Sequence, residues 1–245
     1  MFPPKYIQAL LWLTATATSC TAQPPAFILA GDSTTAPKGG WGPAFISSLT
    51  NGATGTNYAA RGRTTTSFRA DGYWDKVLDA VKANADSHTP YVTIQFGHND
   101  QKTEKGLDVF IENLVEMDGE VRAAGGTPIF LTPLSRRKFD GDGQVKEDLA
   151  NVVKMTEKVA AKTGSLLGDL NERSMAYLED IGNKNATTYD FKKGDKTHVN
   201  KAGGEVFAGV VALLLEDLVP ELSEYIAPDK KLVKALEAGK YYYPK

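Results

Sequence analysis

The stretch Ala26-Phe27-Ile28-Leu29-Ala30-Gly31-Asp32-Ser33 decides the fold of this chain. Its five apolar residues, ended by a glycine, are typical of a strand buried on both faces. Similar short runs follow, and segments with apolar residues at helical spacing separate them. The runs lie at residues 55–59, 91–96, 128–131 and 165–170, and the helical segments at 43–49, 73–81, 109–124, 149–161 and 203–218. This alternation predicts an α/β domain with five parallel strands and helices on both faces, in three layers α/β/α.

Polar residues with chemical potential follow three of these strands. Ser33 comes just after the first strand, Gly62 after the second, and Asn99 after the third. Because binding sites of parallel sheets lie at the carboxyl ends of the strands, we expect these three residues to share one edge.

A fourth block, Asp195-Lys196-Thr197-His198, precedes the last long helical segment. A serine hydroxyl is a weak nucleophile unless a base takes its proton, and that base needs a third group to hold its tautomer. Asp195 and His198 can come from a single loop, which makes them candidate partners for Ser33. Taken alone, the pair is equally compatible with an ordinary helix entry.

Acyl transfer also needs hydrogen-bond donors at the developing oxyanion, and each contributes about 3–4 kcal/mol to lowering the barrier. The side-chain amide of Asn99 and the backbone N–H groups of Gly62 and Ser33 are candidate donors. Glycine at position 62 lets the backbone approach a substrate without a Cβ in the way.

The order of these four blocks resembles that of the SGNH (GDSL-type) hydrolases, from about Phe27 to about Leu215. The details resemble the rhamnogalacturonan acetylesterases within that superfamily, through Gly40-Trp41-Gly42, Ala60-Arg61-Gly62-Arg63 and Phe96-Gly97-His98-Asn99-Asp100. The resemblance implies a flavodoxin-like five-stranded sheet and a reaction that needs no cofactor. It also implies a catalytic triad of Ser33, Asp195 and His198, with Ser33, Gly62 and Asn99 as the oxyanion hole.

The N-terminus has the pattern of a secretory signal peptide over residues 1–22, with a positive Lys5, a short apolar stretch and small residues before a cleavage point. We therefore expect a secreted, extracellular protein whose residues 23–245 form a single catalytic domain. A lipid anchor on Cys20, the chain's one cysteine, is the less favoured alternative because the preceding residues lack the usual leucine.

Composition narrows the possible partners. The chain of 245 residues has a formal net charge of -2 and no dense basic block, which disfavours nucleic acid as a partner. No later segment is long and apolar enough for a membrane span, and we expect a monomer. The three histidines, His88, His98 and His198, lack metal-ligand spacing, so we expect no metal. His98 adjoins Asn99 and is interpreted as a positioning or packing residue, while Asp32 and Asp100 are expected to hydrogen-bond their own loops.

Arg136 and Arg137 follow the fourth strand and should therefore lie near the same edge. Two interpretations stay open: solvated side chains, or a guanidinium that grips a carboxylate in two places, as in the galacturonate units of pectin. The sequon Asn185-Ala186-Thr187 leaves glycosylation open as well.

Together these features predict a serine esterase that removes acetyl groups from plant cell-wall polysaccharide, most specifically rhamnogalacturonan. The alternatives are an esterase for acetylated xylan or other acetylated sugars, a GDSL lipase, and a non-catalytic carbohydrate-binding protein on the same fold.

Overall fold

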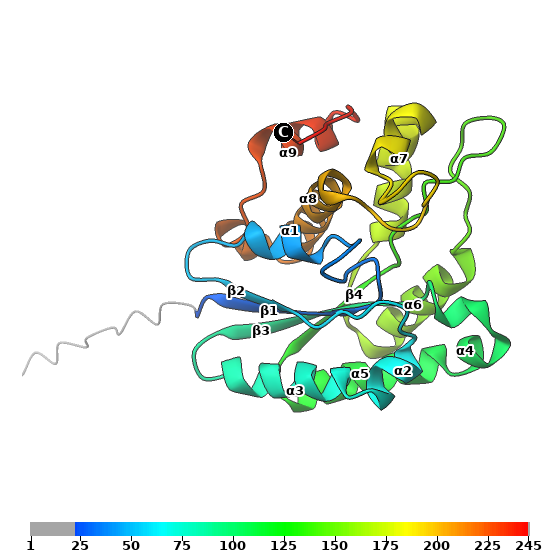
Figure 1. Ribbon diagram of the computed structural model, residues 1–245. Coiled ribbons are helices and arrows are strands. Elements are labelled where there is room, and N and C mark those ends of the chain that lie inside the picture. The colour runs from blue at the N-terminus through cyan, green and yellow to red at the C-terminus, as the bar shows by residue number, and fades with distance from the viewer. Residues whose placement is uncertain (1–22, 245) are drawn as a thin grey trace, which may run out of the picture.

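A computed structural model describes residues 23–244 of the chain, which are built around one parallel sheet (Figure 1). The sheet has the strand order β2-β1-β3-β4-β5, and every pair of neighbours is parallel. This order is flavodoxin-like, with β1 and β3 side by side at the point where the chain changes direction. The strands are β1 (Pro25–Gly31), β2 (Thr54–Asn57), β3 (Thr89–Gln95), β4 (Thr127–Leu131) and β5 (Leu166–Gly168).

Helices cover both faces of the sheet and complete three layers (Figure 1). One face carries α1 (Gly42–Ser47), α7 (Leu170–Ala186), α8 (Lys201–Leu218) and α9 (Lys230–Glu237). The other carries α2 (Thr65–Ala70), α3 (Tyr73–Asn84), α4 (Glu104–Asp108), α5 (Phe110–Ala123) and α6 (Ala150–Thr163).

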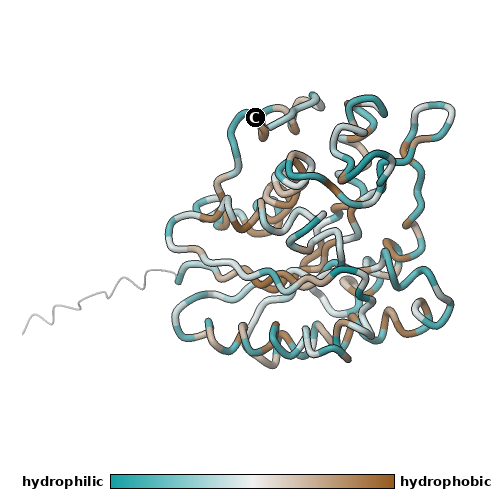
Figure 2. The backbone as a smooth tube through the Cα atoms, viewed as in Figure 1, coloured by the Kyte–Doolittle hydropathy of each residue, from teal (hydrophilic) through white to brown (hydrophobic). Residues whose placement is uncertain are grey.

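Alternation along β1 divides the apolar residues between two cores. Phe27 and Leu29 join the core beneath α1, α7 and α8, whereas Ile28 and Ala30 join the core against α3, α5 and α6. The apolar colouring is concentrated along the strands and the helix sides that face them (Figure 2). A strand covered on both faces has no polar side, and this explains the unbroken apolar run in the sequence.

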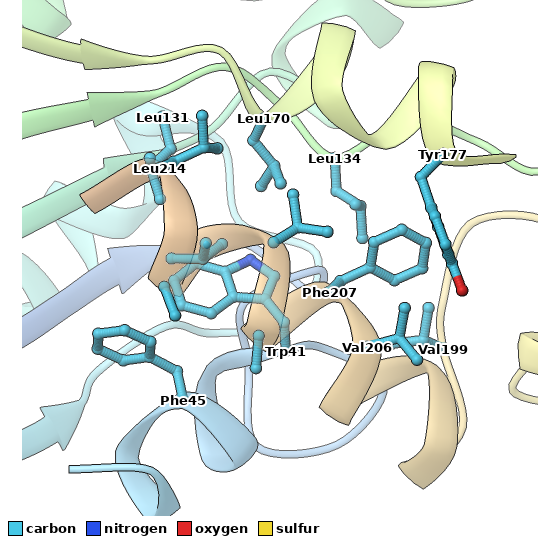
Figure 3. Packing of buried hydrophobic residues seen from close by; sticks show 14 of the residues in the cluster. Trp41, Phe45, Leu131, Leu134, Leu170, Tyr177, Val199, Val206, Phe207 and Leu214 are labelled. Carbon is cyan, nitrogen blue, oxygen red and sulfur yellow. The ribbon is translucent and has the colours of Figure 1, made fainter. Parts of the chain in front are cut away.

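The helix pair α1 and α8 brings the two ends of the chain's functional region together. Trp41, just before α1, packs edge-on against Phe45 with ring centroids 5.9 Å apart, and Figure 3 shows Trp41 between Phe45 and Phe207 of α8. Because Ser33 precedes α1 and His198 precedes α8, this packing fixes the distance between the two polar loops.

The predicted fold class and all five strands are confirmed, as are the helices expected at residues 43–49, 73–81, 109–124, 149–161 and 203–218, within a few residues at each end. The strand expected at 165–170 is shorter, because α7 begins at Leu170. We did not predict α7, although Asp169 accepts a hydrogen bond from the Glu172 backbone N–H and is a recognisable helix cap. The tail forms a two-turn helix, α9, whose Leu232 is buried.

Among residues 23–244 there is no helix with the length and apolar character needed to cross a membrane. The expected signal peptide at residues 1–22 lies outside the described residues.

Candidate active site

Ser33 lies in the tight turn that follows β1 at the carboxyl edge of the sheet. The Asp32 carboxylate shapes this turn by accepting hydrogen bonds from the backbone N–H and the hydroxyl of Thr34, both at 2.9 Å. The residue before Asp32 has to be glycine, since a Cβ at Gly31 would lie 2.7 Å from the Thr35 hydroxyl and 2.9 Å from the Gln95 carbonyl oxygen. The expectation that Asp32 serves its own loop is therefore confirmed.

The structure brings Ser33, His198 and Asp195 into one hydrogen-bonded chain. The Nε2 atom of His198 lies 2.9 Å from Ser33 Oγ, and its Nδ1 atom lies 3.0 Å from Asp195 Oδ2. Each imidazole nitrogen thus has a different partner, and this arrangement fixes the tautomer in which Nε2 can accept the serine proton. The geometry is that of an activated nucleophile.

Asp195 is held in its ionised form. Burial alone would raise its pKa, but hydrogen bonds from the backbone N–H and imidazole of His198, and from the Thr197 N–H, outweigh burial and lower it. A carboxylate that stays charged can stabilise an imidazolium on His198.

The loop that carries Gly62 is hydrogen-bonded both to the end of β1 and to the side chain of Asn99. The loop of Gly62 is tied to β1, because the Ala60 N–H donates to the Gly31 carbonyl oxygen at 3.0 Å. The Asn99 Nδ2 donates to the Arg63 carbonyl oxygen at 3.0 Å. Gly62 has a φ of +75°, a conformation that favours glycine, and its surroundings are open.

The orientation of the Asn99 amide suits a donor. Its oxygen accepts a hydrogen bond from Lys102 Nζ at 2.6 Å, so the amide nitrogen points the other way. That nitrogen carries two hydrogens, and Arg63 takes only one of them. The second hydrogen has no acceptor among residues 23–244, and the role of Asn99 as an oxyanion donor stays a prediction.

Gln95, which the sequence interpretation did not single out, organises the floor of the site. Its side-chain oxygen accepts from Trp41 Nε1 at 2.6 Å and from the Thr35 hydroxyl at 3.0 Å, and its nitrogen donates to the Thr34 hydroxyl at 2.7 Å. A fully buried amide with all of these partners locks the Ser33 turn against α1. The available signal was a glutamine at the carboxyl end of a buried strand.

His98 and Asp100 are buried, and each hydrogen-bonds to a segment that is distant in the sequence. The Nε2 atom of His98 lies 2.8 Å from the Leu134 carbonyl oxygen, and burial lowers its pKa despite the opposing charge of Asp32. This neutral imidazole fits the expected packing role. Asp100 differs from expectation, because its carboxylate accepts from the N–H and hydroxyl of Thr65 and so anchors α2 rather than its own loop.

The structure contradicts the prediction that Arg137 binds substrate. The side chain is fully buried, and its Nε lies 2.9 Å from Asp190 Oδ1. Its Nη2 donates to the carbonyl oxygens of Asp195 at 2.8 Å and His198 at 2.5 Å. The alternative of two solvated arginines is wrong for Arg137 as well, since its guanidinium faces inward. Arg136 is mostly buried, 3.9 Å from Asp148, and its proposed role stays a prediction.

Arg137 therefore fastens the loop that carries Asp195 and His198. The loop is closed at its base by a bridge between Asp190 and Val199, and the Arg137 backbone N–H donates to the Lys196 carbonyl oxygen at 2.9 Å. Burial lowers the pKa of the guanidinium while the Asp190 carboxylate opposes this, and an arginine remains charged in either case. One cation thus satisfies the carbonyls at both ends of the Asp195–His198 segment.

No group of three or more histidine, cysteine or acidic residues capable of holding a metal ion occurs in the part of the chain that the structure describes.

Comparison with known proteins identifies the family of the chain. Residues 29–206 match the GDSL-like Lipase/Acylhydrolase family. A relative, the rhamnogalacturonan acetylesterase RhgT of Bacillus subtilis (strain 168), is 27% identical over 225 residues, which cover 83% of this chain and 95% of the relative.

Solved structures show the same fold. Protein YXIM of Bacillus subtilis aligns with a TM-score of 0.68 and 25% identity over 83% of this chain, which spans 57% of that protein. The acetylxylan esterase Axe2 of Geobacillus stearothermophilus aligns with a TM-score of 0.58 and 18% identity, covering 79% of this chain and 95% of that one.

Fold and sequence together define a hydrolase of the SGNH type that acts on carboxylic esters. The chain belongs to the GDSL-like Lipase/Acylhydrolase family, and the resemblance to rhamnogalacturonan acetylesterases is confirmed by a relative of that name.

Proposed function

We propose that this protein is a secreted serine esterase that removes acetyl groups from acidic plant cell-wall polysaccharide, with rhamnogalacturonan as the preferred substrate. The observation that carries the proposal is the hydrogen-bonded chain from Ser33 Oγ through His198 to Asp195, with distances of 2.9 and 3.0 Å. A relative with that substrate in its name supports the choice of polymer.

The reaction begins when Ser33 Oγ attacks the acetyl carbonyl carbon and its proton passes to Nε2 of His198. Negative charge then develops on the carbonyl oxygen, where the N–H groups of Ser33 and Gly62 and the Asn99 amide donate hydrogen bonds. Asp195 stabilises the imidazolium meanwhile.

The proton on Nε2 next passes to the sugar oxygen, which leaves as a hydroxyl while the acetyl group stays on Ser33. Water then attacks this ester with His198 as base, which releases acetate and restores the serine. Every proton in the cycle moves through one imidazole nitrogen.

Acetylated xylan is the second candidate substrate, since a structural neighbour is an acetylxylan esterase. Measuring acetate release from acetylated rhamnogalacturonan, acetylated pectin and acetylated xylan separates the two. We expect the highest kcat/KM on rhamnogalacturonan. Preference for xylan would refute the proposed substrate. A protein that binds these polymers but hydrolyses neither them nor p-nitrophenyl acetate would be a carbohydrate-binding protein.

A further inference from the structure

A groove of about 940 Å³ begins beside the candidate active site and runs away from it along α8. Its near end is formed by Lys38 and Gly39, and a Cβ on Gly39 would lie 3.2 Å from Cβ of His198. Gly39 therefore lies between the groove and the side chain of His198.

The course of the groove follows from small residues on two helices. Gly204 and Ala208 of α8 line one wall and Ala44 and Ser47 of α1 the other. Its lining extends along α8 from Lys201 to Gly209, and these two residues are about 12 Å apart along the helix axis at the usual rise. The volume is near the upper end of the range of about 300–1,000 Å³ for ligand sites, which suits a chain of sugars better than a single acetyl group.

The charges in the groove favour an anion. Its three lysines face two carboxylates, of which Glu205 lies 3.8 Å from Lys201. The other, Asp229, caps α9 by accepting from the backbone N–H groups of Lys231 and Leu232. Within residues 23–244, the ammonium groups of Lys38 and Lys231 have no ion-pair partner, and both side chains are exposed.

Aromatic rings stand at the end of the groove nearer the candidate active site. Phe191 lies there, with the Arg61 guanidinium 5.9 Å from its ring centroid. Tyr243 is half exposed and stacks on Tyr189 at 6.4 Å with an interplanar angle of 8°, and Tyr189 packs beside Gly203 in the first turn of α8. Such rings offer rigid apolar faces for the C–H faces of sugars, while lysines at both ends reach carboxylates.

We propose that this groove binds the uronate-bearing chain of an acidic polysaccharide beyond the acetylated sugar, with Lys38 and Lys231 contacting successive carboxylates. The inference rests on the proposed function and names how that same site selects an acidic polymer. A neutral polymer such as xylan would gain nothing from the two lysines.

The binding experiment uses the Ser33→Ala protein and an oligogalacturonate without acetyl groups, titrated by calorimetry. In that background, Lys38→Ala with Lys231→Ala should weaken binding about two- to thirtyfold, the range for two exposed ion pairs. The loss should shrink as salt is added, because salt screens exposed charges. The matched control is Lys82→Ala with Lys158→Ala, which removes the same charge from α3 and α6 on the opposite face of the sheet.

A second variant tests whether the ligand occupies the groove, without changing any charged residue. Ser47 is an exposed residue of the groove wall, so Ser47→Trp should fill the groove without disturbing the core. We expect it to weaken oligogalacturonate binding at least tenfold and to lower kcat/KM on acetylated rhamnogalacturonan more than on p-nitrophenyl acetate. Binding that is unchanged by Ser47→Trp, or reduced equally by the groove pair and the control pair, would overturn the proposal.

The two proposals can fail separately. If acetylated rhamnogalacturonan is deacetylated well and oligogalacturonate binding is unaffected by the groove variants, the groove proposal fails and the esterase proposal stands. If oligogalacturonate binding depends on the groove but the polymer is not deacetylated, the proposed function fails instead.

Discussion

Replacing Arg137 should weaken both the fold and the proposed chemistry, because this buried cation fastens the loop of Asp195 and His198. The guanidinium makes three charge-assisted contacts, to Asp190 Oδ1 and to the carbonyl oxygens of Asp195 and His198. At about 1.5–3 kcal/mol each, they would sum to about 4.5–9 kcal/mol. Removing the cation also removes its own burial penalty, but it leaves the buried Asp190 carboxylate with fewer partners. The net loss in the free energy of unfolding for breaking a buried pair is about 3–5 kcal/mol.

We expect Arg137→Ala to fall near the lower end of that range, because Lys196 Nζ still lies 3.1 Å from the other oxygen of Asp190. Typical domains have about 5–15 kcal/mol of stability, so the variant should remain folded. Urea denaturation measures the change. The control is Arg173→Ala, whose exposed partner is Asp217 and whose loss should cost no more than about 1 kcal/mol.

Activity should fall along with stability. Arg137→Lys keeps the charge but presents a single ammonium in place of a fork, and it cannot reach both carbonyls and Asp190 together. We expect kcat for p-nitrophenyl acetate to drop while KM changes little, since the loop positions the base rather than the substrate. If Arg137→Ala lowers the free energy of unfolding by less than 1 kcal/mol and kcat is unchanged in both variants, Arg137 does not fasten the loop of Asp195 and His198.

Three further predictions concern the oxyanion donor, pH and metals. Asn99→Ala should lower kcat about 10²–10³-fold with little change in KM in steady-state assays, because its amide acts mainly in the transition state; a pure KM effect would make Asn99 a substrate-binding residue instead. Hydrogen bonds from Arg69 lower the pKa of Glu120 against the opposing effect of burial. The Glu120 carboxylate therefore stabilises the fold fully at pH values above its ordinary pKa of 4.5, and this contribution is lost as the pH falls through the lower pKa of the folded state. Glu120→Gln should therefore lower the Tm at neutral pH and approach the wild-type Tm in acid, and a constant difference at every pH would contradict this origin. EDTA should leave acetyl-ester hydrolysis unchanged, and activity lost to EDTA and restored by a metal ion would contradict a reaction carried by side chains alone.

The sequence predicted the central strands well, because β1, β3 and β4 carry short runs of mostly apolar, buried residues. The edge strand β2 has no such run and was located only through the alternation of strands and helices. The sequence also indicated which strand ends carry Ser33, Gly62 and Asn99, since the position of a residue just past a strand follows directly from the strand itself. Helix α7 was missed although its buried residues Leu170, Tyr177, Leu178 and Ile181 stand at helical spacing, and Gly182, with a φ of +72°, interrupts only its last part.

Contacts between residues that are far apart in the sequence could not be predicted from local sequence patterns. Nothing local indicates that Arg137 reaches a loop 58 residues further along the chain, because Arg136 and Arg137 are neighbours in the loop after β4 and only the tertiary fold decides which of them faces inward. The same holds for Gln95, whose partners Thr34, Thr35 and Trp41 lie in the segment between β1 and α1. Such roles depend on strand order, which the composition of a single strand does not contain.

If Ser33 forms the acetyl-enzyme, the kcat/KM of Ser33→Ala on p-nitrophenyl acetate, measured beside that of the surface control Ser87→Ala, should show it. Removing the nucleophile should reduce the rate by a factor on the order of 10⁴–10⁶, with the circular dichroism spectrum unchanged. Ser87→Ala should retain full activity, since Ser87 is exposed near the start of β3, at the opposite edge of the sheet. Hydrolysis by Ser33→Ala at close to the wild-type rate would contradict the account.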